Sequence, residues 1–194
     1  VGSRMTAING ISLPETNTVN TYNDYAFIED DRTNLAHSGR VFVGDEFGGV
    51  TERSYAFSFP NLLSGQPVKL DISVVAAADV NGSYFNVSTD GAANANSIYI
   101  PRVDDFLGIK DVAERQERQL NLFNVPTNFN VHLSFDRNGD FNTKGWLDYL
   151  QANAVSILRY NNQALYFRNI SSVGIGNVFK FEIQNMNAKV EIWD

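Results

Sequence analysis

The most regular pattern of apolar and polar residues in the chain lies between residues 129 and 135. Phe129, Val131, Leu133 and Phe135 alternate there with polar residues. A period of two places the apolar side chains on one face of an extended strand and the polar side chains on the other. The segment is therefore predicted to be a half-buried strand.

The residues that follow predict that the chain turns back. Residues 136–140 are rich in Asp, Asn and Gly, which bond their own backbone or adopt positive φ readily. Residues 146–151 are aromatic and aliphatic, which is typical of a returning strand of a hairpin. A helix is the alternative, because Leu147, Leu150, Ala154 and Leu158 also have helical spacing, but we favour the strand.

Similar short patterns recur along most of the chain. They predict further strands at residues 39–47, 55–59, 68–74, 84–89, 97–100, 164–168, 178–183 and 188–193. Residues 112–120 contain good helix formers but have a thin apolar side, so helix and strand both stay open there. The predicted core comprises the alternating apolar residues of two strands: Val68, Leu70, Ile72, Val74, Phe129, Val131, Leu133 and Phe135.

Many short strands without a recurring helix predict an all-β fold, namely an antiparallel β-sandwich or jelly roll that forms a single domain. The length of 194 residues agrees with one domain. Residues 1–24 lack periodicity, so we expect an N-terminal strand-and-loop segment there and the sandwich in residues 25–194. No secretory signal is visible at Val1, so we expect a mature or excised segment of the parent protein.

Composition narrows the function classes. The net charge of −7 opposes binding to nucleic acid, which requires neutralisation of phosphates. No apolar run approaches the ~20 residues that span a bilayer, so we expect no membrane insertion. The chain has no cysteine, which excludes disulfides, thiol nucleophiles and thiolate metal sites within it.

Asp136, Asn138 and Asp140 form a weak candidate metal site. A calcium-binding loop begins with oxygen-bearing side chains at alternate positions, as here, because a hard cation needs several oxygen ligands. The later Gly and Glu of a calcium-binding helix-loop-helix are replaced by Phe141 and Leu147, so a simple turn is the favoured interpretation. His37 and His132, the only histidines, are expected to face solvent, without an evident acidic partner in the sequence.

The sequence assigns no catalytic or cofactor-binding residue, and no cofactor is expected, because the common local signatures of hydrolysis and nucleotide binding are missing. Two other functions stay open. A carbohydrate-binding β-sandwich module predicts a shallow cleft with two or more solvent-facing aromatic side chains. A glycosidase-like enzyme predicts two carboxylates about 5 to 10 Å apart in a pocket.

Four blocks of residues together resemble the PorU-like family, the cell-surface sortases of the type IX secretion system in Bacteroidetes, which carry a gingipain-type cysteine peptidase domain. The blocks are Ser38–Phe47, Phe57–Leu62, Gly145–Leu150 with Leu165–Arg168 after it, and Val190–Asp194. The chain departs from the family pattern at Val43, where an aromatic residue is expected. The last block resembles the point at which such proteins continue into the peptidase domain.

The resemblance implies a parent protein at the extracellular, outer-membrane surface of a Gram-negative bacterium. That parent would cleave the sorting signal of exported cargo and join the cargo to lipopolysaccharide through a Cys/His dyad. No residue of this dyad can be assigned here, because the chain has no cysteine. The implied role is that of a non-catalytic accessory domain, with the downstream peptidase domain, secreted cargo or other secretion-system proteins as partners.

Overall fold

The computed structural model describes residues 13–37, 42–90, 92–106, 109–110, 112–186 and 192. Strands account for nearly all of the regular structure, and one short 3₁₀ helix, η1 (Ile170–Ser172), is the exception within the described residues. No described helix is long and apolar enough to cross a lipid bilayer. The predicted all-β, single-domain sandwich is confirmed.

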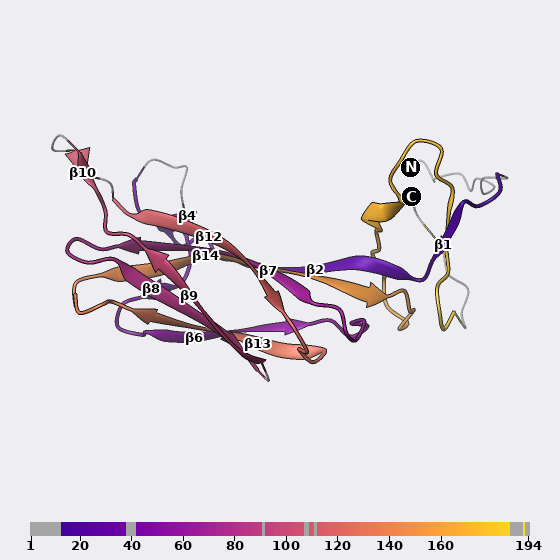
Figure 1. The fold of residues 1–194 in the computed structure, drawn as a ribbon, viewed down its shortest axis with the longest axis horizontal. Coiled ribbons are helices and arrows are strands. Elements are labelled where there is room, and N and C mark those ends of the chain that lie inside the picture. Colours follow the sequence, from indigo (N-terminus) through magenta and orange to yellow (C-terminus); the bar gives the residue numbers. More distant parts are fainter. Residues whose placement is uncertain are drawn as a thin grey trace, which may run out of the picture.

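Two antiparallel sheets form the two layers, with β12 and β14 in one and β6 and β13 in the other (Figure 1). The strands of the first sheet, in spatial order, are β12 (Glu114–Leu122), β7 (Val68–Ala77), β14 (Lys144–Ile157) and β2 (Thr21–Glu29), and β5 (Glu46–Phe47) also pairs with β14. The strands of the second sheet are β6 (Glu52–Ser58), β13 (Asn128–Asp136), β8 (Ser83–Thr89) and β9 (Ala92–Ile100).

Three further two-stranded pairs lie outside these sheets. They are β3 (Thr33–Asn34) with β4 (Phe42–Val43), β10 (Asp105–Phe106) with β11 (Ile109–Lys110), and β1 (Asn17–Val19) with β15 (Phe179–Phe181). The β1–β15 pair is parallel, unlike the pairs of the sandwich.

The core fills the space between the two sheets, and the predicted core residues are all buried. Leu133 is 1% exposed, and each of the other seven is 5% exposed or less. Aromatic rings fill one part of this core, where the ring centroid of Phe85 lies 5.0 Å from that of Phe47 and 4.7 Å from that of Phe135. Alternation along the chain therefore identified the buried faces of β7 and β13 correctly.

The predicted hairpin between residues 129 and 151 is wrong. Both segments are strands, but β13 pairs with β6 and β8 in the second sheet, whereas β14 pairs with β7, β2 and β5 in the first. The turn at residues 136–143 therefore carries the chain from one layer to the other. Each strand has a neighbour on both edges, so neither has a free edge for the other.

A β-bulge explains why the apolar residues of β14 have a spacing that resembles a helix. The pairing of β14 with β7 shifts between Leu147 and Tyr149. The extra residue, Asp148, separates the inward-facing Leu147 and Leu150 by three positions instead of two. The resulting spacing imitates a helix in the sequence, although the segment is a strand.

Other predicted elements had mixed outcomes. In the segment 112–120, where helix and strand stayed open, residues 114–120 belong to strand β12. Residues 178–183 contain the shorter β15. Residues 164–168 have no regular structure, so the strand predicted there is wrong. Of the strand expected at residues 188–193, only Ile192 lies within the described residues.

The C-terminal residues from 159 to 186 lie with β1 beyond one end of the sandwich, which we call the terminal extension (Figure 1). Hydrogen bonds attach it to the beginning of β2: Asn23 N donates to Arg168 O at 2.8 Å, and Ile170 N donates to Asn23 Oδ1 at 2.8 Å. The domain boundary expected after residue 24 falls inside β2, where Asp24 and Tyr25 are both paired with β14.

Candidate functional site

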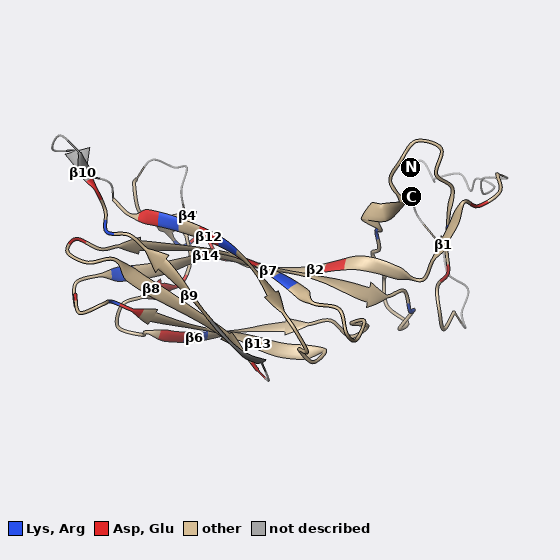
Figure 2. Ribbon diagram, in the orientation of Figure 1, with Lys and Arg blue, Asp and Glu red and all other residues tan. Residues whose placement is uncertain are grey.

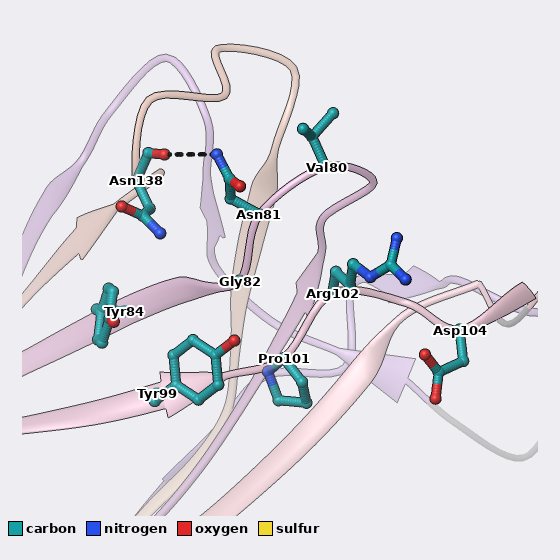
Figure 3. A pocket seen from close by; sticks show the side chains of 9 residues that line it. All are labelled: Val80, Asn81, Gly82, Tyr84, Tyr99, Pro101, Arg102, Asp104 and Asn138. Atoms are coloured by element: carbon teal, nitrogen blue, oxygen red, sulfur yellow. Dashed lines mark hydrogen bonds between the residues drawn. The ribbon is translucent and has the colours of Figure 1, made fainter.

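A shallow cleft lies at the rim of the second sheet, where β8 begins and β9 ends (Figure 3). Its volume is about 580 Å³. The residues that line it come from the segment before β8, from β8, from β9 and the segment after it, and from the turn after β13. Three separate parts of the chain therefore meet at this position.

Two tyrosine rings form the aromatic part of the cleft. Tyr84 and Tyr99 are directly paired across β8 and β9, and their ring centroids are 5.2 Å apart at an interplanar angle of 49°. Tyr99 is 48% exposed. Its ring lies over Gly82, where an added Cβ would be only 2.3 Å from Tyr99 Cε2. The absence of a side chain at Gly82 thus provides the space for this ring.

Polar groups flank the two rings. Asn81 Nδ2 donates to the backbone oxygen of Asn138 at 3.3 Å, which connects the segment before β8 to the turn after β13. Arg102 and Asp104, from the segment after β9, also line the cleft (Figure 3). Aromatic faces beside amide and charged groups can pack on the C–H groups of a sugar ring and bond its hydroxyls. The sequence analysis did not assign these two tyrosines. A two-residue turn at residues 90–91 would place Tyr84 opposite Ser97, and the register shift between β8 and β9 places it opposite Tyr99 instead.

The side chains of the candidate metal site form the turn itself. Asp136 Oδ1 accepts from Asn138 N at 2.8 Å, and Asp140 Oδ1 accepts from Asn142 N at 3.0 Å. Asn138 and Gly139 both have positive φ, of 50° and 85°, as tight turns require. Among the described residues, no group of three or more His, Asp or Glu side chains is arranged to hold a cation. Cation binding by this turn stays a prediction.

His132 has an acidic partner that the sequence did not reveal. Its Nε2 lies 2.7 Å from Asp90 Oδ1, and its Nδ1 lies 2.7 Å from Ser54 Oγ. Because a carboxylate only accepts, Nε2 carries the proton and Ser54 donates to Nδ1 when the ring is neutral. Asn130 also donates to Asp90, and hydrogen bonds from His132 and Asn130 lower the pKa of that carboxyl. Asp90 and His132 are 42 positions apart, so no local pattern could have paired them.

The order Ser–His–Asp resembles a nucleophilic serine site, but its environment favours a structural role. The side chains of His132 and Asp90 are 41% and 44% exposed, so water screens their interaction. Asp90 and His132 together connect the end of β8 to β13 and, through Ser54, to β6. His37, by contrast, is exposed at a turn with φ of 50° and lies outside this group.

Charge does not mark a site for polyanions. Acidic and basic residues both appear on the described strands, without a long continuous basic stripe (Figure 2). Together with the net charge of −7, this distribution is unlike that of a surface that binds phosphate chains.

The fold defines the chain as an antiparallel β-sandwich domain. No family model matches the chain, and no curated protein matches it. Among solved structures, it is similar to dimeric latent PorU from Porphyromonas gingivalis, with a TM-score of 0.68 and 17% sequence identity. The match covers 89% of this chain but only 16% of the PorU chain, so it shows a shared fold with one part of a much longer protein.

Weaker similarities connect the chain to carbohydrate-binding modules. One is the CBM36-1 domain of a multidomain xylanase from the hindgut metagenome of Trinervitermes trinervoides, with a TM-score of 0.42 and 13% identity over 66% of this chain and 96% of that domain. Another is a CBM36 module in complex with calcium and xylotriose, with a TM-score of 0.42 and 12% identity over 66% of this chain and 98% of that module.

Proposed function

We propose that this chain is a non-catalytic accessory β-sandwich domain of a larger, PorU-like surface protein. It supports a cysteine peptidase domain of the same protein or presents cargo to it, at the outer surface of a Gram-negative bacterium. The observation that carries the proposal is a group of apolar side chains exposed on the terminal extension: Tyr166, Ile170, Val173 and Ile175.

These side chains lie within ten residues of one another in sequence, and Ile175 is fully exposed, at 108%. They are not part of the core between the sheets, whose described members end at Ala154. An apolar group concentrated on one segment typically marks a protein–protein contact, because each buried apolar side chain stabilises the contact by roughly 1.5–3 kcal/mol. We infer that the surface is covered by a neighbouring domain in the parent protein.

The similarity to PorU supports this proposal through its extent. The matched part makes up 89% of the chain, which is more than the segment from the start of β2 at Thr21 to the end of β14 at Ile157 contains. Part of the matched chain therefore lies outside the segment from β2 to β14. The peptidase domain, the cargo and the surface location come from the sequence resemblance and are part of the proposal.

The test replaces Ile170 and Ile175 by Ser in the parent protein and measures the processing of its cargo. We expect reduced processing and faster proteolysis at the junction with the next domain, since the apolar contact is lost. The matched control is Val50→Ser, which changes an exposed valine, 53% accessible, next to β6 on the sandwich. Normal processing by the Ile170→Ser/Ile175→Ser variant, with unchanged protease resistance, would contradict the proposal.

Carbohydrate binding is the second candidate function, and the cleft with Tyr84 and Tyr99 favours it. The cleft is shallow and contains two aromatic side chains near solvent, which is the feature that this function predicts. Affinity electrophoresis of the chain in gels that contain soluble polysaccharides would test it. Tyr99→Ala should abolish retardation, and Gly82→Ala should weaken it by displacing the ring of Tyr99. Tyr166→Ala removes a tyrosine that is 89% exposed and lies outside the cleft, so it should leave retardation unchanged. Equal retardation of all variants would exclude the cleft.

A further inference from the structure

The outer face of the first sheet presents a second surface with ligand-binding chemistry. Its strands align Gln119, Asp71, Gln151 and Phe27 as one row that crosses β12, β7, β14 and β2. The neighbouring rows begin at Glu117 and Asn121 on β12 and end at Glu29 and Tyr25 on β2. No residue in these three rows is aliphatic, so the face is made of polar, charged and aromatic side chains.

Hydrogen bonds order the polar side chains of this face. Gln119 Nε2 donates to Asp71 Oδ1 at 2.7 Å, and Asn153 Nδ2 donates to Asp71 Oδ2 at 3.0 Å. Gln151 Nε2 donates in turn to Asn153 Oδ1 at 3.0 Å. The network holds carboxylate and amide groups of three adjacent strands in place, so a ligand would meet an organised set of donors and acceptors.

The same face is hollowed, and an unpaired hydroxyl lies beneath it. A depression of about 290 Å³ is lined by Asp71, Gln119, Gln151 and Tyr149, among others. Ser73 is paired with Glu117 on one side and Tyr149 on the other. Its hydroxyl is fully buried and has no hydrogen-bond partner within the described structure. Because Ser73 has no exposed surface and does not line the depression, its hydroxyl lies beneath the face and is not part of the ligand-binding surface.

Aromatic rings border the hydrogen-bonded network along β14 and β2. The ring centroids of Phe27 and Tyr149 lie 5.8 Å apart, with an interplanar angle of 31°. Phe27 is 47% exposed and Tyr25 is 58% exposed, while Ala26 and Ile28 on the opposite side of β2 pack against the core. The guanidinium carbon of Arg168 lies 5.0 Å from the ring centroid of Tyr25, so Arg168 borders the face where the row from Asn121 ends on β2. The exposed rings therefore serve no burial function within the described sandwich.

We propose that the outer face of the first sheet binds a neutral oligosaccharide that lies across the four strands. Rings of this kind pack on sugar C–H groups, and ordered amides and carboxylates bond sugar hydroxyls. The charges on the face disfavour polyanions, because Asp71, Glu117 and Glu29 outnumber Lys69 within the three rows. The surface differs from the rim cleft, which is built by β8 and β9 of the other sheet.

This inference shares only the ligand class with the second candidate function, so variants of the two surfaces separate them. Calorimetric titration of the purified chain with linear neutral hexasaccharides of glucose, xylose or mannose is the measurement. At least one of these sugars should bind, and Phe27→Ala and Gln119→Ala should each weaken its binding tenfold or more. Phe27→Tyr should retain binding, because it keeps the ring, and Tyr99→Ala in the rim cleft should bind normally. Urea midpoints equal to that of the unmodified chain would establish that the variants are folded.

Four results would overturn the inference. The first is the absence of heat for all of the neutral hexasaccharides at millimolar concentration. The second is unchanged affinity in both Phe27→Ala and Gln119→Ala. The third is loss of binding only in Tyr99→Ala, which would assign the sugar to the rim cleft and leave the second candidate function intact. Preferential binding of a polyanion such as heparin would also contradict the proposed neutral ligand.

Discussion

Gly145 is the position at which a single methyl group should test the packing between the two sheets. It lies in β14, paired with Ala76 of β7 and Phe47 of β5. A Cβ added to it would be 2.8 Å from Phe135 Cε2 and 2.8 Å from Phe85 Cζ. Favourable carbon–carbon contacts lie at about 3.5–4.0 Å, so both rings would have to move by roughly 0.7 Å or more.

The rings near Gly145 have little space in which to move. Phe85 is fully buried between Phe47 and Phe135. Overpacking of a dense core typically costs 1–3 kcal/mol, while replacement of glycine in a strand interior recovers about 0.5–1 kcal/mol of backbone entropy. We therefore expect Gly145→Ala to lower the free energy of unfolding by about 1–2 kcal/mol.

Urea denaturation followed by tryptophan fluorescence measures this change as a shift in midpoint at constant slope. Gly49→Ala is the matched control, because nothing lies within 4 Å of the added Cβ there, and it should change stability by less than about 0.5 kcal/mol. Phe135→Leu in the Gly145→Ala background should cost less than Phe135→Leu alone, since the smaller side chain relieves the clash. Equal midpoints for Gly145→Ala and the unmodified chain would refute the close packing of β14 against these rings.

Two further predictions concern the second sheet. Leu133→Ala should lower the free energy of unfolding by ~2–5 kcal/mol in urea melts, because this 1% exposed side chain leaves a cavity, and a change near zero would mean that it is not in the core. The pKa of Asp90 is lowered in the folded chain, so its contribution to stability is present above the ordinary value of about 3.9 and is lost as the pH falls through the lower folded value. The urea midpoint of Asp90→Asn should therefore fall less between pH 5 and pH 3 than that of the unmodified chain, whereas Asp31→Asn, at an exposed position, should behave like the unmodified chain; identical acid dependence of all three would contradict the role of the His132 contact.

The sequence predicted the faces of the strands well. Alternation in β7 and β13 identified which side chains are buried, because the side-chain period of a strand depends only on local backbone geometry. The same reasoning supports the all-β class, since no long amphipathic helical pattern competes with the strands. At β14 the favoured strand is correct, and the bulge at Asp148 explains why a helix was the alternative. The reasoning failed at residues 164–168, whose short apolar run is not part of a sheet.

The choice of strand partners depended on the tertiary structure. Backbone donors and acceptors are the same in every strand, so an alternating pattern specifies a face but not a neighbour. The Asp, Asn and Gly residues at positions 136–140 are compatible both with a hairpin and with a connection between the two layers. The chain forms the connection, because β13 and β14 pair with different strands in different sheets. The contact of His132 with Asp90 and the rows of side chains on the first sheet follow from that pairing. By itself, the sequence determined a β-rich, acidic, cysteine-free chain with identifiable buried faces. Only the assembled sheets determined which polar and aromatic side chains share a surface. The order of the strands in a sheet brings these side chains together, although they are far apart in the chain.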